Sequence, residues 1–471
     1  MIRKKLAALR TPLIAALMAG ATALPVMAES LADTMVSAYR HSALLDQNRA
    51  VLRAADEDVA AAMAALRPVI SWVAEHSYRN TEGYDSRTTS LNLQAQVTLY
   101  DFGRSQFAID MAKETVLATR AALVGVEQDV LLSAVQVYLD VRSSREQVEL
   151  QENSVRLLSE EQQAASDRYE VGEITQTDVS LADAALAAAR AGLASAQGTL
   201  EISAENFMMV TGHKPGALSA PPPTPRLPAS VDEARAIAQR SHPLIKQAQR
   251  TAAAAELRVG AAAAERNPTI TGTLGVGSSR GNSMQGNALT GYRDVNETTD
   301  SGSASISMQQ TLYSGGRLPA AHRKAMANRD SARADLLNTS RQVSQAVGTA
   351  WAGIDVARAQ IRSIDEQIVA AQQAYNGVRE EATLGARTTL DVLDAEQNLL
   401  EARADKISAE AELQLAHYQL LSAMGLLTVE NLQLGIPTYD PSAYYNAVRN
   451  APYTSNQGQS LDRVLRAIGR E

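Results

Sequence analysis

The sequence predicts a membrane protein of mixed α and β structure that is built from two tandem repeats. Three features of the 471 residues predict it: motifs of the first half return in the second, each half contains stretches that alternate apolar and polar residues, and each half contains one very long uninterrupted helical stretch. Self-similarity at a fixed separation marks a structural unit that is used more than once. Each element predicted in one half is therefore expected to have a counterpart in the other.

The duplication is clearest where the second alternating stretch of each half ends. The residues Thr98-Leu99-Tyr100 return 213 positions later as Thr311-Leu312-Tyr313. The same separation relates further pairs: Gly103-Arg104 to Gly316-Arg317, Gly172 to Gly385, Thr175 to Thr388, Asp178 to Asp391, and Gly212 to Gly425. The opening helices match at a separation of 200 instead. The Gly-, Ser- and Asn-rich residues 280–301 are therefore expected to be a loop inserted between two strands.

These matches define the expected domains. We predict a first repeat at 29–217, a stiff proline-rich linker at 218–228 and a second repeat at 229–427. Each repeat should run in the order helix, two strands, long helix, turn and return helix. Residues 428–471 have no counterpart and are expected to form a loosely ordered C-terminal tail.

Residues 1–28 are predicted to be a secretory signal peptide. Basic residues at 3–5 precede a mostly apolar stretch at 13–26, and Val26-Met27-Ala28 offers a cleavage site. A retained membrane anchor is the alternative, which the short, proline- and glycine-interrupted apolar stretch disfavours. No later segment is predicted to be apolar enough for a membrane-spanning helix.

The composition argues against several classes of protein. The chain has no cysteine, which removes disulfides, thiolate metal sites and cysteine nucleophiles. The net charge of −8, without a basic patch, argues against binding of nucleic acid. The 6 histidines are scattered without metal-ligand spacing, and neither a nucleophile motif nor a phosphate-binding loop occurs. We therefore expect no enzymatic activity, no catalytic residue, no metal and no cofactor.

The alternating stretches predict strands with one apolar and one polar face. In 91–99 the odd positions are apolar and the even positions are polar, and 303–312 shows a similar alternation. Each stretch is close to the roughly 9–11 residues that a tilted strand needs to cross a bilayer. Half-buried strands of a soluble sheet are the alternative. The secretory signal and the polar second face, which suits a wet lumen, favour a membrane barrel.

After each second strand a long helix is predicted. It begins at Gly103 or Gly316 and continues to about Glu170 or Thr383, with proline only in the opening turn of the second copy. A helix of this length would measure about 100 Å. Two adjacent heptad series predict packing against neighbours on both sides, as in a helical wall: Ile109, Val116, Leu123, Val130 and Val137, and Leu117, Val124, Leu131 and Tyr138. A solvent-exposed coiled coil is the alternative.

Four strands in one chain cannot close a membrane barrel, since about eight are needed. Open sheet edges are not tolerated in lipid, so the barrel must be shared between subunits. The strands lie between helices in each half, with the junctions at Gly103-Arg104 and Gly316-Arg317. The helices must then continue the wall on one side of the membrane, as a tube of helices attached to a tube of strands.

The turns at 170–175 and 383–388 are predicted to join each long helix to its return helix. Gly172 and Gly385 suit helix C-terminal caps. The Thr-x-x-Asp patterns that end at Asp178 and Asp391 are typical of capping boxes. Capping alone is therefore a sufficient role for both aspartates.

These motifs are similar to those of a known family. They are the duplicated Leu-Tyr-x-x-Gly-Arg, the turn Tyr169-Glu-Val-Gly172 with Asp178-Val179, and the segment from Gly385 to Ala395. The chain resembles the TolC family of outer-membrane efflux and secretion ducts over nearly its whole mature length. The resemblance implies a homotrimer in which four strands per chain form one twelve-stranded β-barrel in outer-membrane lipid. A long antiparallel α-helical tunnel would continue it across the periplasm.

The resemblance also implies partners and a function. A periplasmic adaptor (membrane fusion protein) and an inner-membrane transporter of ABC, RND or MFS type would recruit the duct. It would conduct cargo passively to the exterior as part of a tripartite efflux pump or a type I secretion system. A periplasmic coiled-coil adaptor or a structural protein of an export system is the alternative.

The resemblance finally implies a gate at the periplasmic tip. Asp391 and Asp394 match the family's aperture acids, and in a trimer they would form two stacked carboxylate rings that attract cations. Capping does not explain Asp394, which lies one turn beyond Asp391 on nearly the same face. A solvated helix face is the alternative.

The ties that would close this gate are only partly retained. Arg387 matches the family's gate arginine, which bonds to the pair matched here by Thr177 and Asp178. Ala382 stands where the family has a gate tyrosine, and Glu161 stands where it has a gate glutamine. One tie is thus lost and another is expected to become a salt bridge. We expect a looser resting gate that opens by an iris-like untwisting of helices.

Overall fold

The computed structural model describes residues 28–81, 84–287 and 291–449. The predicted signal peptide therefore lies, up to residue 27, outside the described part of the chain. The described residues form two compact units. The first comprises 28–40, 134–224 and 371–407, and the second comprises the remaining segments, with the sheet among them.

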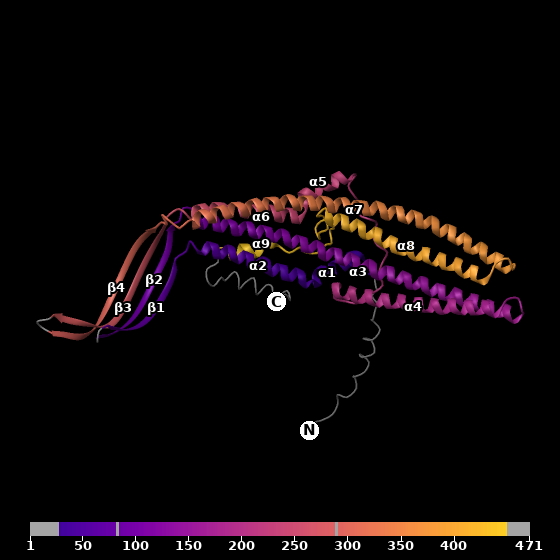
Figure 1. The fold of residues 1–471 in the computed structure, drawn as a ribbon, viewed down its shortest axis with the longest axis horizontal. Helices are drawn as coiled ribbons and strands as arrows, with labels where there is room; N and C mark the ends of the chain where they lie inside the picture. The colour runs from indigo at the N-terminus through magenta and orange to yellow at the C-terminus, as the bar shows by residue number, and fades with distance from the viewer. Residues whose placement is uncertain (1–27, 82–83, 288–290, 450–471) are drawn as a thin grey trace, which may run out of the picture. The chain divides into compact units, whose positions relative to one another are not determined.

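The elements follow one order before residue 220 and the same order after it (Figure 1). The first series is α1 (Leu31–His41), α2 (Ala43–Ala64), β1 (Val69–Thr81), β2 (Tyr84–Tyr100), α3 (Arg104–Glu170) and α4 (Gln176–Thr211). The second is α5 (Val231–Ser241), α6 (Pro243–Ala264), β3 (Thr269–Asn287), β4 (Gly291–Gln309), α7 (Arg317–Thr383) and α8 (Thr389–Ala423). A short helix, α9 (Pro441–Val448), follows. The mixed α and β class is confirmed.

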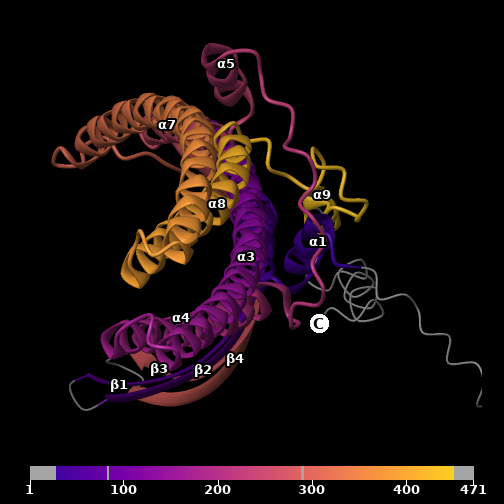
Figure 2. The same cartoon turned by 90° about the vertical axis from the view of Figure 1, so that its right-hand side faces the viewer.

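The four strands form a single antiparallel sheet in the order β1-β2-β3-β4, which Figure 2 shows as one curved layer. The strands contain 13, 17, 19 and 19 residues and are longer than predicted. The expectation of an inserted loop at 280–301 is wrong for its described residues, because they pair as strands, for example Arg280 with Thr298. Backbone ladder bonds satisfy polar residues here as well as apolar ones, so composition alone misjudged this hairpin.

Apolar side chains of the sheet remain uncovered in the single chain. Trp72, Leu91, Leu274 and Ile306 are each more than half exposed. Exposed apolar surface on this scale is typical of contact with lipid or with another chain. Within the described ranges, the outermost strands, β1 and β4, each pair with only one neighbouring strand.

Helices α3 and α7 contain 67 residues each, as predicted, which corresponds to about 100 Å. The first heptad series of α3 is buried along its whole length, from Ile109 to Val137. The second is buried only in its later part, since Leu131 and Tyr138 are covered whereas Val124 is 38% exposed. Packing on both sides thus holds for only part of α3 within one chain.

The residues after 427 are better ordered than predicted, as far as they are described. The backbone N–H of Val429 donates to the carboxylate of Glu127 at 2.7 Å. The Tyr444 hydroxyl donates to Glu57 on α2, also at 2.7 Å, and α9 packs against α2. These contacts explain why the segment needs no counterpart in the first half to be ordered.

The expectation that no later segment could span a membrane as a helix is also too strong. Helices α3 and α4 each contain a stretch of 18 residues that is long and apolar enough, by composition. In α3, 50% of that stretch is buried within the chain, as in a helix that packs against protein. Valine and leucine give the stretch in α3 its apolar character, whereas the stretch in α4 is rich in alanine, which is small and helix-forming.

Candidate functional site

The first turn, between α3 and α4, is closed by backbone and side-chain caps. Gly172 has φ 79°, which L side chains adopt with strain, and its N–H donates to the carbonyl of Tyr169. Thr175 and Asp178 form a reciprocal capping box at the start of α4. The Thr175 hydroxyl and backbone N–H donate to Asp178 at 2.7 and 3.0 Å, which holds the pKa of Asp178 below its usual range.

The second turn, between α7 and α8, repeats this geometry. Gly385 has φ 74°, and its N–H donates to the carbonyl of Ala382. The backbone N–H and the hydroxyl of Thr388 donate to Asp391 at 3.0 and 2.9 Å, which lowers the pKa of Asp391. Both aspartates are therefore ionised caps. Asp394 lies one turn further along α8, with its side chain exposed.

Arg387 pairs within its own hairpin. Its Nε lies 2.9 Å from Oε2 of Glu381, only six positions earlier across the turn. Among the described residues of this chain, the structure does not bring Arg387 together with Thr177 or Asp178. Glu381 is the nearer partner along the chain, so it captures the guanidinium in the single subunit.

Glu161 forms an ion pair that crosses between the two helical hairpins. Its Oε1 lies 3.2 Å from Nε of Arg379, and these residues lie on α3 and α7 respectively. The guanidinium side is about half exposed, so the pair contributes about 1 kcal/mol or less. Ala382 offers no side-chain hydrogen bond to supplement it.

The strand-to-helix junctions depend on glycine. Gly103 and Gly316 both have φ 88°, so the chain turns from strand into helix there without strain. Asp101 then caps α3, accepting from the backbone of Gly103 and Ser105 at 3.2 and 2.7 Å. Arg104 donates to the carbonyl of Asn267, and the N–H of Arg317 donates to the carbonyl of Ser314.

A chain that contains both a membrane-type sheet and long capped helical hairpins matches a known family. The profile of the family described as "Outer membrane efflux protein" matches residues 35–213 and 235–426. The chain belongs to this family. As an outer membrane efflux protein, it is a channel of the outer membrane that extends into the periplasm, and its family is one of transport proteins.

Individual relatives are similar to this chain over most of their length. The chain is 33% identical to outer membrane efflux protein BepC of Brucella suis over 425 residues, which cover 90% of this chain and 91% of BepC. It is 23% identical to outer membrane protein TolC of Escherichia coli, covering 92% and 90% of the two chains. Its fold is similar to the crystal structure of the CmeC outer membrane channel of Campylobacter jejuni, with a TM-score of 0.74, 14% identity and coverage of 90% and 89%.

Sequence reasoning missed a buried polar cluster in this efflux protein. Glu396 on α8 is only 5% exposed, and neither of its carboxylate oxygens has a hydrogen-bond partner among the described residues. The pKa of Glu396 is raised to about 7, chiefly by burial and also by the nearby Glu161, while Arg379 opposes both. The hydroxyl of Tyr375 on α7 is likewise buried without a partner in the described chain. The signal in the sequence was an acid that lies about one helical turn from Leu393 and from Leu400.

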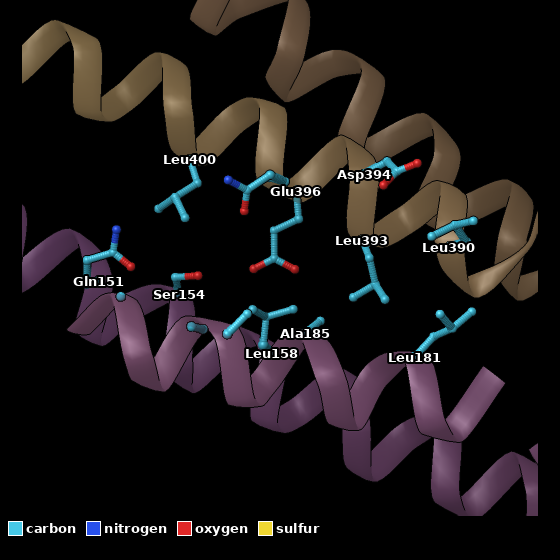
Figure 3. A pocket seen from close by; sticks show the side chains of 14 residues that line it. Gln151, Ser154, Leu158, Leu181, Ala185, Leu390, Leu393, Asp394, Glu396 and Leu400 are labelled. Carbon is cyan, nitrogen blue, oxygen red and sulfur yellow. The ribbon is translucent and has the colours of Figure 1, made fainter. Parts of the chain in front are cut away.

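Glu396 lines a cavity of about 400 Å³ whose walls come from α3, α4 and α8 (Figure 3). Leu158, Leu186, Ala189 and Leu393 form the apolar cluster beside it. Asp394 lies at the rim, and in Figure 3 its carboxylate points away from that of Glu396. Among the described residues, no group of His, Cys, Asp and Glu side chains has a geometry suited to a metal ion.

Proposed function

We propose that three copies of this chain form the exit duct of a tripartite export system, conducting cargo passively from an inner-membrane transporter. The observation that carries the proposal is the four-stranded sheet, which has exposed apolar side chains and two outer strands with one neighbour each. Open edges are not stable in lipid, and three copies of four strands supply the twelve of a closed barrel. The chain itself would perform no catalysis and require no cofactor.

The proposed partners are a periplasmic adaptor and an inner-membrane transporter of ABC, RND or MFS type. Efflux is the better supported of the two export routes, because the relative BepC carries the name of an efflux protein. Type I secretion remains the alternative route through a duct of the same design. The order of repeats, 29–217 and 229–427, would place both helical turns at the same periplasmic end.

We further propose that the second turn carries the gate. Asp391 and Asp394 would form two carboxylate rings around the axis of the trimer, while Asp391 also caps α8. The Glu161–Arg379 pair would tie the hairpins together in the closed state. When the hairpins approach and the gate closes, Arg387 would leave Glu381 and donate hydrogen bonds to Thr177 and Asp178. When the gate opens, Arg387 would return to Glu381.

The assembly is tested by isolating the protein from the outer-membrane fraction in detergent and measuring its mass by light scattering. We expect a trimer that changes its electrophoretic mobility on heating, because a shared barrel resists detergent until it unfolds. A soluble monomer in the periplasmic fraction would contradict the proposal and favour a periplasmic adaptor.

A further inference from the structure

We propose that the cavity at Glu396 is a binding site for a small organic monocation with an apolar body, such as a protonated amine. The site lies within one unit of the chain, where α8 faces the hairpin of α3 and α4. Asp391 does not line it, whereas the charges of the Glu161–Arg379 tie act on Glu396. The proposal goes beyond the role of the chain as an exit duct and does not depend on it.

The carboxylate of Glu396 is the feature that points to a ligand. It is more than nine-tenths buried, both oxygens lack a hydrogen-bond partner in the part of the chain that the structure describes, and Figure 3 shows it pointing from α8 toward Ser154 and Leu158. The buried Ser154 hydroxyl, which lines the same cavity, also lacks a partner among these residues. Unpaired buried charges are costly unless a counter-charge or hydrogen bonds compensate them. A bound ammonium group would supply both.

The surrounding charges leave room for one positive charge. Glu161 on α3 already pairs with Arg379 on α7, so ionised Glu396 leaves the group with one uncompensated negative charge. Tyr375 on α7 adds a neutral hydroxyl, and the wall from α4 contributes only apolar residues and glycine. Asp394 at the rim increases the attraction for a cation. A single buried carboxylate is a poor site for a hard metal ion, which needs several oxygen ligands.

The remaining walls determine the rest of the ligand. Leu158, Leu181, Leu393 and Leu400 line the cavity from both sides. A cavity of a few hundred cubic ångströms with many apolar residues and a few polar groups, here Glu396 inside and Asp394 at the rim, is typical of small-molecule sites. The site therefore fits a hydrocarbon body of the size of one aromatic ring that carries a charged amine.

The test uses the full-length protein in lipid nanodiscs and isothermal titration calorimetry with benzylammonium, with benzyl alcohol as the neutral probe of similar shape. At pH 8 we expect the wild type to bind benzylammonium at least about tenfold more tightly than benzyl alcohol, because only the cation pairs with Glu396. The affinity for the cation should fall about tenfold between pH 8 and pH 6, as Glu396 takes up its proton.

Variants distinguish binding in the cavity from nonspecific adsorption of the probes to protein or lipid. Glu396→Gln should abolish the preference for the cation, and Glu396→Asp should retain part of it. Asp183→Asn is the matched control, because Asp183 occupies the equivalent position 213 residues earlier and is exposed, and it should bind like the wild type. Ala185→Leu should weaken both probes by filling the cavity. Equal binding of both probes to the wild type, equal binding to Glu396→Gln, or no binding at all would overturn the proposal.

Discussion

The two helical hairpins use one backbone design with opposite side-chain chemistry. In the first hairpin, Gln162 on α3 donates to Asp183 on α4 at 3.0 Å on an exposed surface. The equivalent residues 213 positions later are Tyr375 on α7 and Glu396 on α8. These two are buried, and neither has a hydrogen-bond partner among the described residues. The same position is thus solvated in one copy and desolvated in the other.

The difference shows which properties of the hairpin were kept. Both turns retain the left-handed glycine and the threonine–aspartate capping box, because the backbone needs them to end one helix and start the next. The side chains around the turn diverge instead. Ile174 corresponds to Arg387, and Leu181 corresponds to Asp394. The charged groups proposed to act in gating are concentrated on the second hairpin.

The largest expected effect concerns the buried acid of the second hairpin. Replacing Glu396 by Leu should stabilise the protein by about 2 kcal/mol at pH 8, after allowance for water that reaches the site. The pKa of Glu396 is raised in the folded state to about 7 from 4.5. Ionisation of Glu396 therefore destabilises the folded state increasingly as the pH rises from 4.5 to 7. Above pH 7 this destabilisation is fully present. Thermal unfolding in detergent at pH 5 and pH 8 measures the difference.

The matched variant of the first hairpin is Asp183→Leu. It should change stability by no more than about 0.5 kcal/mol at either pH, because the position is exposed. If Glu396→Leu increases the free energy of unfolding equally at pH 5 and pH 8, the buried charge is not the cause of the stabilisation.

The caps of the two hairpins should respond alike. Thr175→Ala and Thr388→Ala each remove the hydroxyl of a capping box and should each cost about 1 kcal/mol in unfolding free energy. Chemical denaturation of each single variant and of the double variant checks this. Clearly unequal costs, or a cost near zero for Thr388→Ala, would mean that the two turns do not share one capping mechanism.

A tyrosine restored at position 382 should tighten the gate of the second hairpin. One added hydrogen bond is worth about 1 kcal/mol, so Ala382→Tyr should reduce single-channel conductance in lipid bilayers several-fold. Ala382→Phe is the control, since it adds the ring without the hydroxyl. If the phenylalanine reduces conductance as much as the tyrosine, the effect is steric and the proposed tie is absent.

The smallest effect is expected at the ion pair between the hairpins. Arg379→Ala should destabilise the protein by about 1 kcal/mol or less, because the pair is partly exposed. High salt should reduce this difference further by screening. The Arg379→Ala substitution should nevertheless raise the open probability of the channel measured in bilayers. An unchanged open probability at low salt would remove Glu161 and Arg379 from the gate.

Local rules of sequence predicted much of this fold. The capping boxes, the turn glycines and the 67-residue helices follow from spacing along the chain, and the structure shows them at the expected residues. The strands at 280–301 were missed because ladder bonds override a loop-like composition. The order after residue 427 was missed because it depends on long-range contacts such as Tyr444 with Glu57.

The site was predicted less completely than the fold. Motif spacing identified Asp391, Asp394 and Arg387, but it could not show that Arg387 pairs with Glu381 in the single chain. The cavity at Glu396 was missed altogether. Periodicity places this acid on α8, whereas its burial depends on how α8 faces α3 and α4, which no local pattern encodes.

Ion selectivity tests most directly whether the second hairpin carries the gate. The measurement is the reversal potential of the channel in a planar bilayer with a salt gradient. We expect a cation-selective wild type, a large loss of selectivity in the double variant Asp391→Asn with Asp394→Asn, and none in Asp183→Asn, which removes an exposed carboxylate of the first hairpin. An unchanged reversal potential in the double variant, or an equal loss in Asp183→Asn, would contradict the account.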